Sequence, residues 1–282
     1  MRRAAPLPVR DGLGPARLRL QGGNVLAEFT RRFGSGAKVL NGEVVDGDGV
    51  AVDATTVLAA GSHVYLYRDL PDEAEVPGAI PVLYRDDNIV VVDKPHFLAT
   101  MPRGSHVVQT ALVRLRRDLG LGELSPAHRL DRLTAGVLLF TVRREVRGAY
   151  QTLFARGEVA KTYLAYSSMQ PGLSAPQVIS NRIIKHRGVL QAQIEPGEPN
   201  AETLVEPLGS DRYRLTPRTG RTHQLRLHMA SLGVPIDNDP LYPNVVDIAG
   251  DDFTSPLRLV AHRLEFDDPM TGEHRCFVSS RT

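Results

Sequence analysis

The sequence predicts an α+β fold with a largely antiparallel mixed sheet and a small additional N-terminal segment. Short Val-rich runs separated by Gly, Pro and Asp turns outnumber strand–helix–strand units, and only a few segments have the apolar spacing of an amphipathic helix. The length of 282 residues, 42% of them hydrophobic, allows one large domain, one small one and a sizeable buried core.

The N-terminal part differs in pattern from the rest of the chain. Its first residues combine Pro, Gly and Arg without periodicity, which predicts a flexible basic arm. Residues 24–33 favour a short helix, and residues 42–68 alternate Val-rich runs with turns typical of hairpins. The acidic, Pro-rich stretch 69–81 is typical of a linker. The domains expected are therefore an arm at 1–20, a small domain with its linker at 21–78, and a large domain at 79–282.

In the large domain, β-branched apolar runs predict strands and periodic runs predict helices. Val146, Ala149, Tyr150, Leu153 and Phe154 have the spacing of one helix face. The elements expected, in order, are a strand at 88–92, a helix at 106–118, a strand at 135–142, a helix at 143–157, a strand at 160–168, several strands between 177 and 217, a helix at 222–232, and strands at 258–266 and 274–279.

The charge is distributed unevenly along the chain. The net charge is only +2, yet residues 41–80 hold eight acidic residues and one Arg, a net of −7, so the remainder carries +9. This asymmetry indicates that the larger part binds a polyanion, and nucleic acid is the polyanion expected. The excess of 30 Arg over 4 Lys is better explained by a genome rich in G and C.

Several classes of function lack support in the sequence. Cys276, the single cysteine, cannot form an internal disulfide or a Cys-based metal site. No apolar run is long enough to cross a membrane and no secretory signal precedes the domains, so we expect a cytoplasmic protein with no membrane partner. Motifs for nucleotide binding, dinucleotide redox chemistry and zinc hydrolysis are missing. We therefore expect neither a metal nor an organic cofactor.

Three polar segments are not explained by a core. The first is SPAHRLDRLTAG at 125–136, where charged and hydroxyl side chains crowd a turn before an apolar strand. A lone Asp in such a turn usually caps the chain or pairs with a neighbouring Arg, so Asp131 alone does not establish a site. Another of the three is KTYLA at 161–165, where Lys161 and Tyr163 share one strand face. A Tyr on a strand is most often part of the hydrophobic core.

The second polar segment is LTPRTGRTHQLRLHM at 215–229. Five cationic or titratable side chains surround a Thr-Gly turn and a helix N-terminus, an arrangement that offers donors to phosphates. A solvated basic helix face explains the same pattern equally well. The residues concerned are Arg218, Arg221, His223, Arg226 and His228.

Taken together and in order, these segments resemble the RluA family of RNA pseudouridine synthases. DDNIVVVDKP (86–95), HRLDRLTAG (128–136), KTYLA (161–165), the stretch 215–242 and AHRLEF (261–266) are each similar to a motif of that family. Ala135, Val234 and Asn238 stand where the family often has Ser, His and Gly, and they keep side-chain size and turn character. The resemblance covers about residues 80–280.

The resemblance implies a pseudouridine synthase fold, with helices flanking the sheet and a central RNA-binding cleft, and a reaction without cofactor. It assigns Asp131 as the catalytic carboxylate, Arg221 as its bidentate partner and Tyr163 as the ring that stacks on uracil. Arg129 is implied to fill the gap that the flipped base leaves in the RNA. Charge and neighbourhood add further RNA contacts, which are Arg132, Lys161, Arg218, His223 and Arg226.

Alternatives remain open at this stage. A catalytically inactive RNA-binding protein would share the fold, and a glycoside hydrolase would need a second acid near Asp131. The sequence does not decide whether Asp131 attacks C1′, attacks C6 or removes a sugar proton. We expect ribosomal RNA rather than transfer RNA as substrate, and a monomer.

The small domain also has a partial resemblance. Residues 24–68 keep an outline similar to the RNA-binding domain of the ribosomal-protein S-four type that many relatives carry. We expect no counterpart of its second, basic helix, because Gly34–Gly42 leads directly into acidic hairpins.

Overall fold

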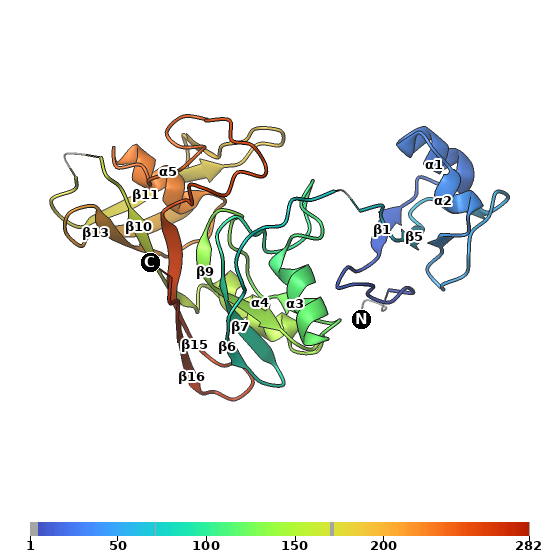
Figure 1. The fold of residues 1–282 in the computed structure, drawn as a ribbon, viewed down its shortest axis with the longest axis horizontal. Coiled ribbons are helices and arrows are strands. Elements are labelled where there is room, and N and C mark those ends of the chain that lie inside the picture. The colour runs from blue at the N-terminus through green and yellow to red at the C-terminus, as the bar shows by residue number, and fades with distance from the viewer. Residues whose placement is uncertain (1–4, 71, 170–171, 282) are drawn as a thin grey trace. The chain divides into compact units, whose positions relative to one another are not determined.

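The computed structural model describes residues 5–70, 72–169 and 172–281 and divides the chain into two compact units (Figure 1). The smaller unit comprises Met1–Asp72 with Arg116–Gly122, and the larger comprises Glu73–Leu115 and Glu123–Thr282. None of the described helices has the length and apolar character that crossing a membrane requires.

The boundary between the units falls between Asp72 and Glu73, inside the predicted linker at 69–81. The carboxylate of Glu73 accepts hydrogen bonds from the backbone N–H groups of Val107, Val108 and Gln109, at 2.9, 2.7 and 3.0 Å. A carboxylate that accepts three backbone N–H groups anchors its segment firmly. The stretch from Glu73 to residue 78 is therefore part of the larger unit and not a free linker.

The smaller unit is built around a three-stranded antiparallel sheet in the order β1-β5-β3. One face of α1 covers it, because Val25 and Phe29 are buried with Val44 and Val64. Asn24 accepts the N–H of Ala27 at the start of α1, and a Gly in the left-handed region ends it. The elements are β1 (Ala16–Arg19), β2 (Gly23–Asn24), α1 (Val25–Phe33), α2 (Ala37–Leu40), β3 (Val44–Val45), β4 (Val57–Leu58) and β5 (His63–Leu66).

Two expectations for this unit were wrong. The predicted flexible arm at 1–20 contains β1, whose Ala16 and Leu18 pack against the core while its backbone pairs with β5. The stretch Gly34–Gly42 holds α2, a single helical turn, where no second helix was expected. Val39 is 1% exposed on this turn, and its burial explains why the Gly-flanked segment becomes helical.

The larger unit is organised by an 11-stranded mixed sheet with two helices and the first part of a third, α3, and this confirms the predicted α+β class. The order along the sheet is β12-β11-β13-β14-β10-β15-β9-β7-β6, with β16 on β15 and β8 on β9. The strands are β6 (Val82–Arg85), β7 (Ile89–Lys94), β8 (Ser125–Pro126), β9 (Ala135–Thr141), β10 (Ala160–Tyr166), β11 (Gln177–Ile184), β12 (Gln193–Glu195), β13 (Ala201–Pro207), β14 (Arg212–Pro217), β15 (Leu259–Asp267) and β16 (His274–Val278). The helices are α3 (Ala111–Leu119), α4 (Arg147–Arg156) and α5 (Gln224–Ser231).

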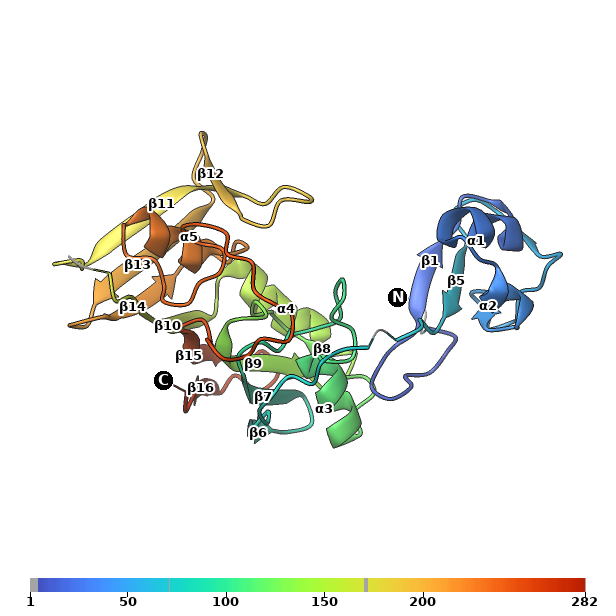
Figure 2. The ribbon, with the colours of Figure 1, turned by 45° about the horizontal axis from the view of Figure 1, so that its top comes forward.

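Two large hydrophobic clusters and a small one around Ile183 lie along this sheet in the part of the chain that the structure describes. The first joins α4 to β7, β9 and β15, and the fully buried Tyr150 occupies it with its hydroxyl bonded to Asp268. The second joins α5 to β10, β13 and β14 through Leu225 and Met229, the helix face that the sequence predicted. Figure 2 shows α4 and α5 lying over different strands of the sheet.

The strands β9 and β15 form the seam between these clusters. They pair in parallel through only two residue pairs, Val260 with Ala135 and Ala261 with Gly136, whereas the other named strand pairs of the larger unit are antiparallel. Gly136 has φ of +110°, and a Cβ there would lie 2.2 Å from the carbonyl oxygen of Ala261. The close approach of β9 and β15 therefore requires glycine at this position.

Replacing Gly136 with Ala is expected to lower the free energy of unfolding of the larger unit by about 3 kcal/mol or more, because strain and a backbone clash combine. Gly148→Ala is the control. This residue lies in α4 with no neighbour within 4 Å of an added Cβ. The control should gain up to about 1 kcal/mol from helix propensity. Denaturant titration of both variants measures the difference, and equal stabilities would contradict this account of the seam.

Candidate active site

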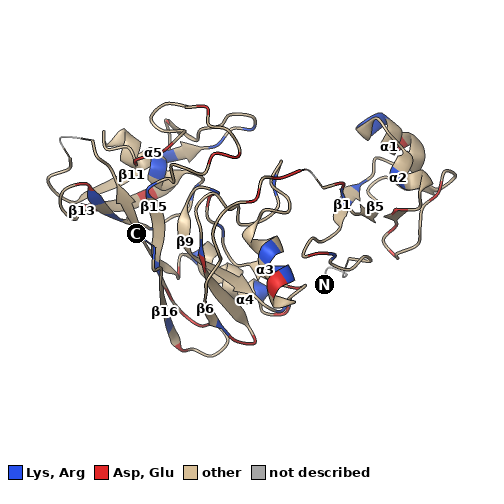
Figure 3. Cartoon of the chain, in the orientation of Figure 1, with Lys and Arg blue, Asp and Glu red and all other residues tan. Residues whose placement is uncertain are grey.

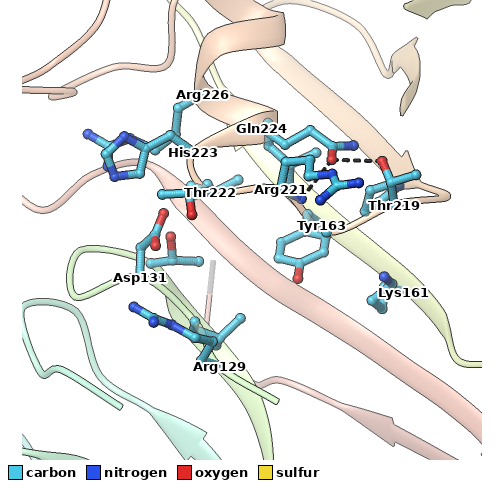
Figure 4. Close-up of a pocket in the computed structure, with 16 residues that line it drawn as sticks. Arg129, Asp131, Lys161, Tyr163, Thr219, Arg221, Thr222, His223, Gln224 and Arg226 are labelled. Carbon is cyan, nitrogen blue, oxygen red and sulfur yellow. Dashed lines mark hydrogen bonds between the residues drawn. The ribbon is translucent and has the colours of Figure 1, made fainter. Parts of the chain in front are cut away.

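A pocket opens at the seam, where the turn before β9 meets β10 and the turn between β14 and α5 (Figure 4). The carboxylate of Asp131 points toward the turn that carries Thr222 and His223. The pocket is lined by Arg129, Leu130, Asp131, Thr134, Lys161, Tyr163, Pro217, Thr219, Gly220, Arg221, Thr222, His223, Gln224, Leu225, Arg226 and Leu259. All three polar segments singled out in the sequence thus contribute to one site.

The turn that carries Asp131 is held through its backbone. The Asp131 carbonyl accepts the N–H of Thr134 at 3.1 Å, which closes the turn. The Thr100 hydroxyl donates to the carbonyl of Leu130 at 2.8 Å and accepts its N–H at 3.1 Å. His96 donates through Nδ1 to the carbonyl of Leu133 at 2.8 Å. These contacts fix the backbone on both sides of Asp131 and leave its carboxylate free to face the pocket.

Lys94 completes this support from the end of β7. Its ammonium, fully buried, donates to the carbonyls of Leu98 at 2.7 Å, Pro95 at 3.0 Å and Arg132 at 3.3 Å. Burial lowers the pKa of Lys94 to about 7, and the nearby charge of Asp131 opposes that shift. Lys94, His96 and Thr100 were not predicted from the sequence as supports of the turn. The Asp93-Lys94-Pro95 run at the end of an apolar strand was the available signal for Lys94.

Arg226 forms a buried, two-point ion pair at the site. Its side chain is 3% exposed, and its Nε and Nη2 donate to the two carboxylate oxygens of Asp239 at 2.8 and 2.5 Å. Burial lowers the pKa of Arg226, but the hydrogen bonds and charge of Asp239, with the charge of Asp131, outweigh it and raise the pKa. Arg226 is therefore a buried cation of the pocket wall, paired with Asp239. Its predicted contact with RNA stays a prediction, although Asp239 already binds its guanidinium.

Arg221 lines the pocket but does not hold the catalytic candidate. Its Nε donates to the carbonyl of Asn200 at 3.1 Å, and its guanidinium points away from Asp131 (Figure 4). Within the described residues no ion pair joins the two side chains, so the predicted bidentate partnership with Asp131 is wrong for this structure. The two arginines differ because they occupy different positions relative to α5. Arg221 lies in the turn before α5, whereas Arg226 lies inside the helix and faces the core.

Gln224 fixes the turn that presents Arg221 and Thr222. Its side-chain oxygen accepts the hydroxyl of Thr219 at 2.8 Å and the N–H of Arg221 at 3.0 Å. Its amide nitrogen donates to the carbonyl of Glu202 and the hydroxyl of Thr203, both at 2.9 Å. Gln224 is 3% exposed; two of its hydrogen bonds hold the turn together and two tie the turn to β13. The role of Gln224 was also not predicted from the sequence.

Tyr163 and Lys161 lie on β10 at the floor of the pocket, on the shared strand face that the sequence predicted. Burial and the charge of Asp131 raise the pKa of the Tyr163 phenol well above its usual value, so the ring is neutral. Burial lowers the pKa of Lys161 below its ordinary value. The half-buried Tyr163 ring provides an apolar face next to the carboxylate, as stacking on a base requires.

His223 contributes a polar edge and little charge. Burial lowers its pKa although the charge of Asp131 opposes the shift, so the imidazole is neutral near pH 7. Its Nδ1 lies 3.1 Å from the hydroxyl of Tyr242, which also contacts the backbone of Ala192. His223 thus reaches the pocket as predicted, but as a hydrogen-bonding group and not as a cation.

Two predicted RNA contacts lie outside the pocket. Arg218, directly after β14, is 79% exposed and pairs with Glu202 at 2.7 Å. Arg132 points toward a separate small cavity lined by Phe97, Leu133 and Pro240. Arg129, in contrast, is exposed at the rim of the site pocket. Basic residues on α1, α3 and α5 show that positive charge is spread over several elements of the chain (Figure 3).

The composition of the pocket limits its chemistry. Asp131 is the only carboxylate among the described lining residues, and the buried Asp239 behind it is already paired with Arg226. Hydrolysis of a glycosidic bond by two carboxylates is therefore not supported. Within the described residues no group of three His, Cys, Asp or Glu side chains is placed to hold a metal ion. The site offers one nucleophile or base beside an aromatic face, with cations around it.

Comparisons with known proteins agree on one family. The profile of the RNA pseudouridylate synthase family matches residues 88–231. The dual-specificity RNA pseudouridine synthase RluA of Pasteurella multocida is 32% identical over 209 residues, covering 70% of this chain and 91% of that protein. The mitochondrial tRNA pseudouridine(32) synthase of Saccharomyces cerevisiae is 31% identical over 72% of this chain, which spans 46% of the yeast protein. The solved structure of human RNA pseudouridylate synthase domain containing 1 aligns with a TM-score of 0.58 at 24% identity, covering 73% of this chain and 86% of the human one.

The chain belongs to the RNA pseudouridylate synthase family, within its RluA group. It is an isomerase that converts uridine in RNA to pseudouridine. The match includes the Asp131 turn, β10 and the α5 turn, so every lining residue of the pocket except Leu259 lies inside the matched region.

Substituting Lys for each arginine distinguishes the buried role of Arg226 from the exposed position of Arg221. Arg226→Lys should lower the free energy of unfolding by about 2 kcal/mol or more, because an ammonium cannot bond both oxygens of the buried Asp239. Arg221→Lys should change it by less than about 0.5 kcal/mol, because that side chain is exposed. Denaturant titrations of the two variants test this ranking. A larger loss for Arg221→Lys would contradict the assignment.

Proposed function

We propose that this chain isomerises specific uridines in structured RNA, and that Asp131 is the carboxylate that performs the reaction. The observation that supports the proposal most is the placement of one carboxylate beside the Tyr163 ring, in a pocket whose other charged lining residues are basic. Ribosomal RNA remains the predicted substrate. The relatives named above include a transfer RNA enzyme and a dual-specificity enzyme, so both RNA classes belong in its test.

The reaction needs no co-reactant. The N1–C1′ bond of uridine breaks, the uracil turns, and a C5–C1′ bond forms, while C5 loses a proton and N1 gains one. The carboxylate of Asp131 can act as the nucleophile or as the base in this sequence. Its position in a turn held by Thr100, His96 and Lys94 fixes the approach to the sugar.

Arg226, and not Arg221, is the cation that interacts with the catalytic carboxylate in this proposal. The hydrogen bonds and charge of Asp239 raise the pKa of Arg226 against the effect of burial, and the charge of Asp131 adds to this rise, so Arg226 is a lasting cation in the field of Asp131. Asp239 holds the guanidinium in place from the opposite side. A fixed cation behind the carboxylate stabilises the charge without competing with the substrate for the open face of the pocket.

The neighbouring side chains suit a flipped nucleotide. A base taken out of an RNA stack requires a pocket with an aromatic or apolar face, and Tyr163 supplies one. Arg129 lies at the exposed rim, where its planar guanidinium can occupy the gap left in the RNA. Lys161 is placed to meet a phosphate or a sugar oxygen.

The replacement Asp131→Asn should abolish isomerisation, because the amide keeps the volume but cannot act as nucleophile or base. RNA affinity and thermal stability should change little. Tritium release from [5-³H]uridine-labelled RNA measures turnover, and filter binding measures affinity. Asp118→Asn on α3, an exposed Asp paired with Arg117, is the control and should remain active. Substantial turnover by the Asp131→Asn variant would refute the assignment.

The ring of Tyr163 should matter more than its hydroxyl. Tyr163→Phe keeps a face for stacking, whereas Tyr163→Leu removes it, at a cost of about 1–3 kcal/mol in binding the flipped base. RNA affinity and turnover of the two variants should therefore rank Phe above Leu. If both bind RNA equally poorly, the hydroxyl or plain core packing explains the residue better than stacking does.

A further inference from the structure

The segment after β16 is bound tightly to one buried carboxylate. Asp93, near the end of β7, is 0% exposed. Its Oδ1 accepts the Ser279 hydroxyl at 2.8 Å and Nε of Arg281 at 3.1 Å. Its Oδ2 accepts the N–H of Ser280 at 3.0 Å and the Ser280 hydroxyl at 3.1 Å. Four donors from three consecutive residues thus converge on a single side chain.

Arg281 also binds the backbone of the same region. Its Nη2 donates to the carbonyl of Asp93 at 2.9 Å and to that of Ala79 at 3.3 Å. The N–H of Arg281 donates to the Ser279 hydroxyl at 3.1 Å, so the segment is also braced internally. A buried carboxylate needs such partners, because leaving it unpaired costs several kcal/mol. The 279–281 segment therefore fixes the end of β7 by charge as well as by backbone contact.

The end of β7 is also where the support of the Asp131 turn begins. Lys94, the next residue, donates to the carbonyl of Arg132, and His96 and Thr100 follow within six positions with their bonds to Leu133 and Leu130. Asp93 and Lys94 pair with Val137 and Gly136 of β9, the strand that the turn enters. A shift at Asp93 would thus move both the side chains that hold the turn and the strand that follows it.

We propose that the 279–281 segment is a positioning element for the active site, which acts through Asp93 and residues 94–100 on the turn of Asp131. The proposal rests on the proposed function, since it assumes that the placement of Asp131 limits the reaction. None of the three residues lines the pocket. Their effect on the reaction is therefore indirect, through the backbone of the turn.

The arginines at the two ends of β16 allow a matched test. Arg281 is 26% exposed and pairs with Asp93, which is fully buried. Arg275 is 19% exposed and pairs at 3.6 Å with Asp268, which is also fully buried but bonds Tyr150 under α4. Arg275 also pairs with Glu273 at 2.7 Å and Asp86 at 3.9 Å and lies over the Tyr84 ring, so its loss removes at least as many contacts as the loss of Arg281. Each substitution removes an ion pair to a fully buried carboxylate, and only Arg281 pairs with a residue of β7. Ser280→Ala, a milder change at an exposed residue, serves if Arg281→Ala does not fold.

The measurements are made on the full chain with [5-³H]uridine-labelled ribosomal RNA transcripts. We expect Arg281→Ala to lower the single-turnover rate at saturating enzyme by about tenfold or more, since small displacements of a reacting group have large effects. The Kd for RNA should stay within about twofold. Backbone amides of the 130–134 turn should exchange hydrogen faster. Arg275→Ala should lose comparable thermal stability with an unchanged rate and unchanged exchange in that turn.

Two results would overturn the proposal. One is equal loss of rate in both variants in proportion to their loss of stability. The other is unchanged exchange of the turn in Arg281→Ala. Hydrogen exchange does not depend on catalysis. Faster exchange in the turn with no change in rate would show that the 279–281 segment positions the turn but that Asp131 does not limit the reaction, which counts against the proposal as stated. Inactivity of the unmodified chain on every RNA would instead count against the proposed function.

Discussion

The site depends on a backbone turn that is held by side chains from elsewhere in the sequence. The turn from Leu130 to Leu133 presents Asp131, and its carbonyls are bound by Thr100, Lys94 and His96. These three donors come from the end of β7 and the stretch that follows it, and β7 itself pairs with β9 directly after the turn. The Asp131 carboxylate can therefore face an open pocket while hydrogen bonds hold the backbone of its turn in place.

A second set of buried polar contacts fixes the opposite wall. Gln224 bonds the turn before α5 to β13, and the Arg226–Asp239 pair holds a cation behind the carboxylate. Such networks are costly when one member is lost, because a desolvated group is then left without a partner. The same polar groups thus hold the turn before α5 and shape the pocket wall there.

Patterns within short segments were sufficient for much of the fold and for the centre of the site. The apolar periodicity placed α4 and α5 to within a few residues, and Asp131, Tyr163 and Lys161 meet as the motifs indicated. Local patterns could not separate Arg221 from Arg226, because the choice depends on where α5 begins and on Asp239, thirteen residues beyond Arg226.

Contacts between distant segments could not be predicted from the sequence. Thr100 and His96 act on backbone carbonyls thirty or more residues away, and Asp93 meets Ser279 across 186 positions. Neither kind of contact leaves a periodic or spaced signal in one sequence. The short helix α2 was missed for a related reason, since tertiary burial of Val39 outweighs the Gly residues that flank the turn.

The central claim is that one carboxylate, Asp131, isomerises uridine in RNA. Pseudouridine mapping of ribosomal and transfer RNA from cells that lack this protein tests it most directly, with the lost sites restored by the natural chain or by its Asp131→Asn variant. We expect defined pseudouridines to disappear, to return with the natural chain and not to return with the variant. Restoration by the variant, or an unchanged map in the deficient cells, would contradict it.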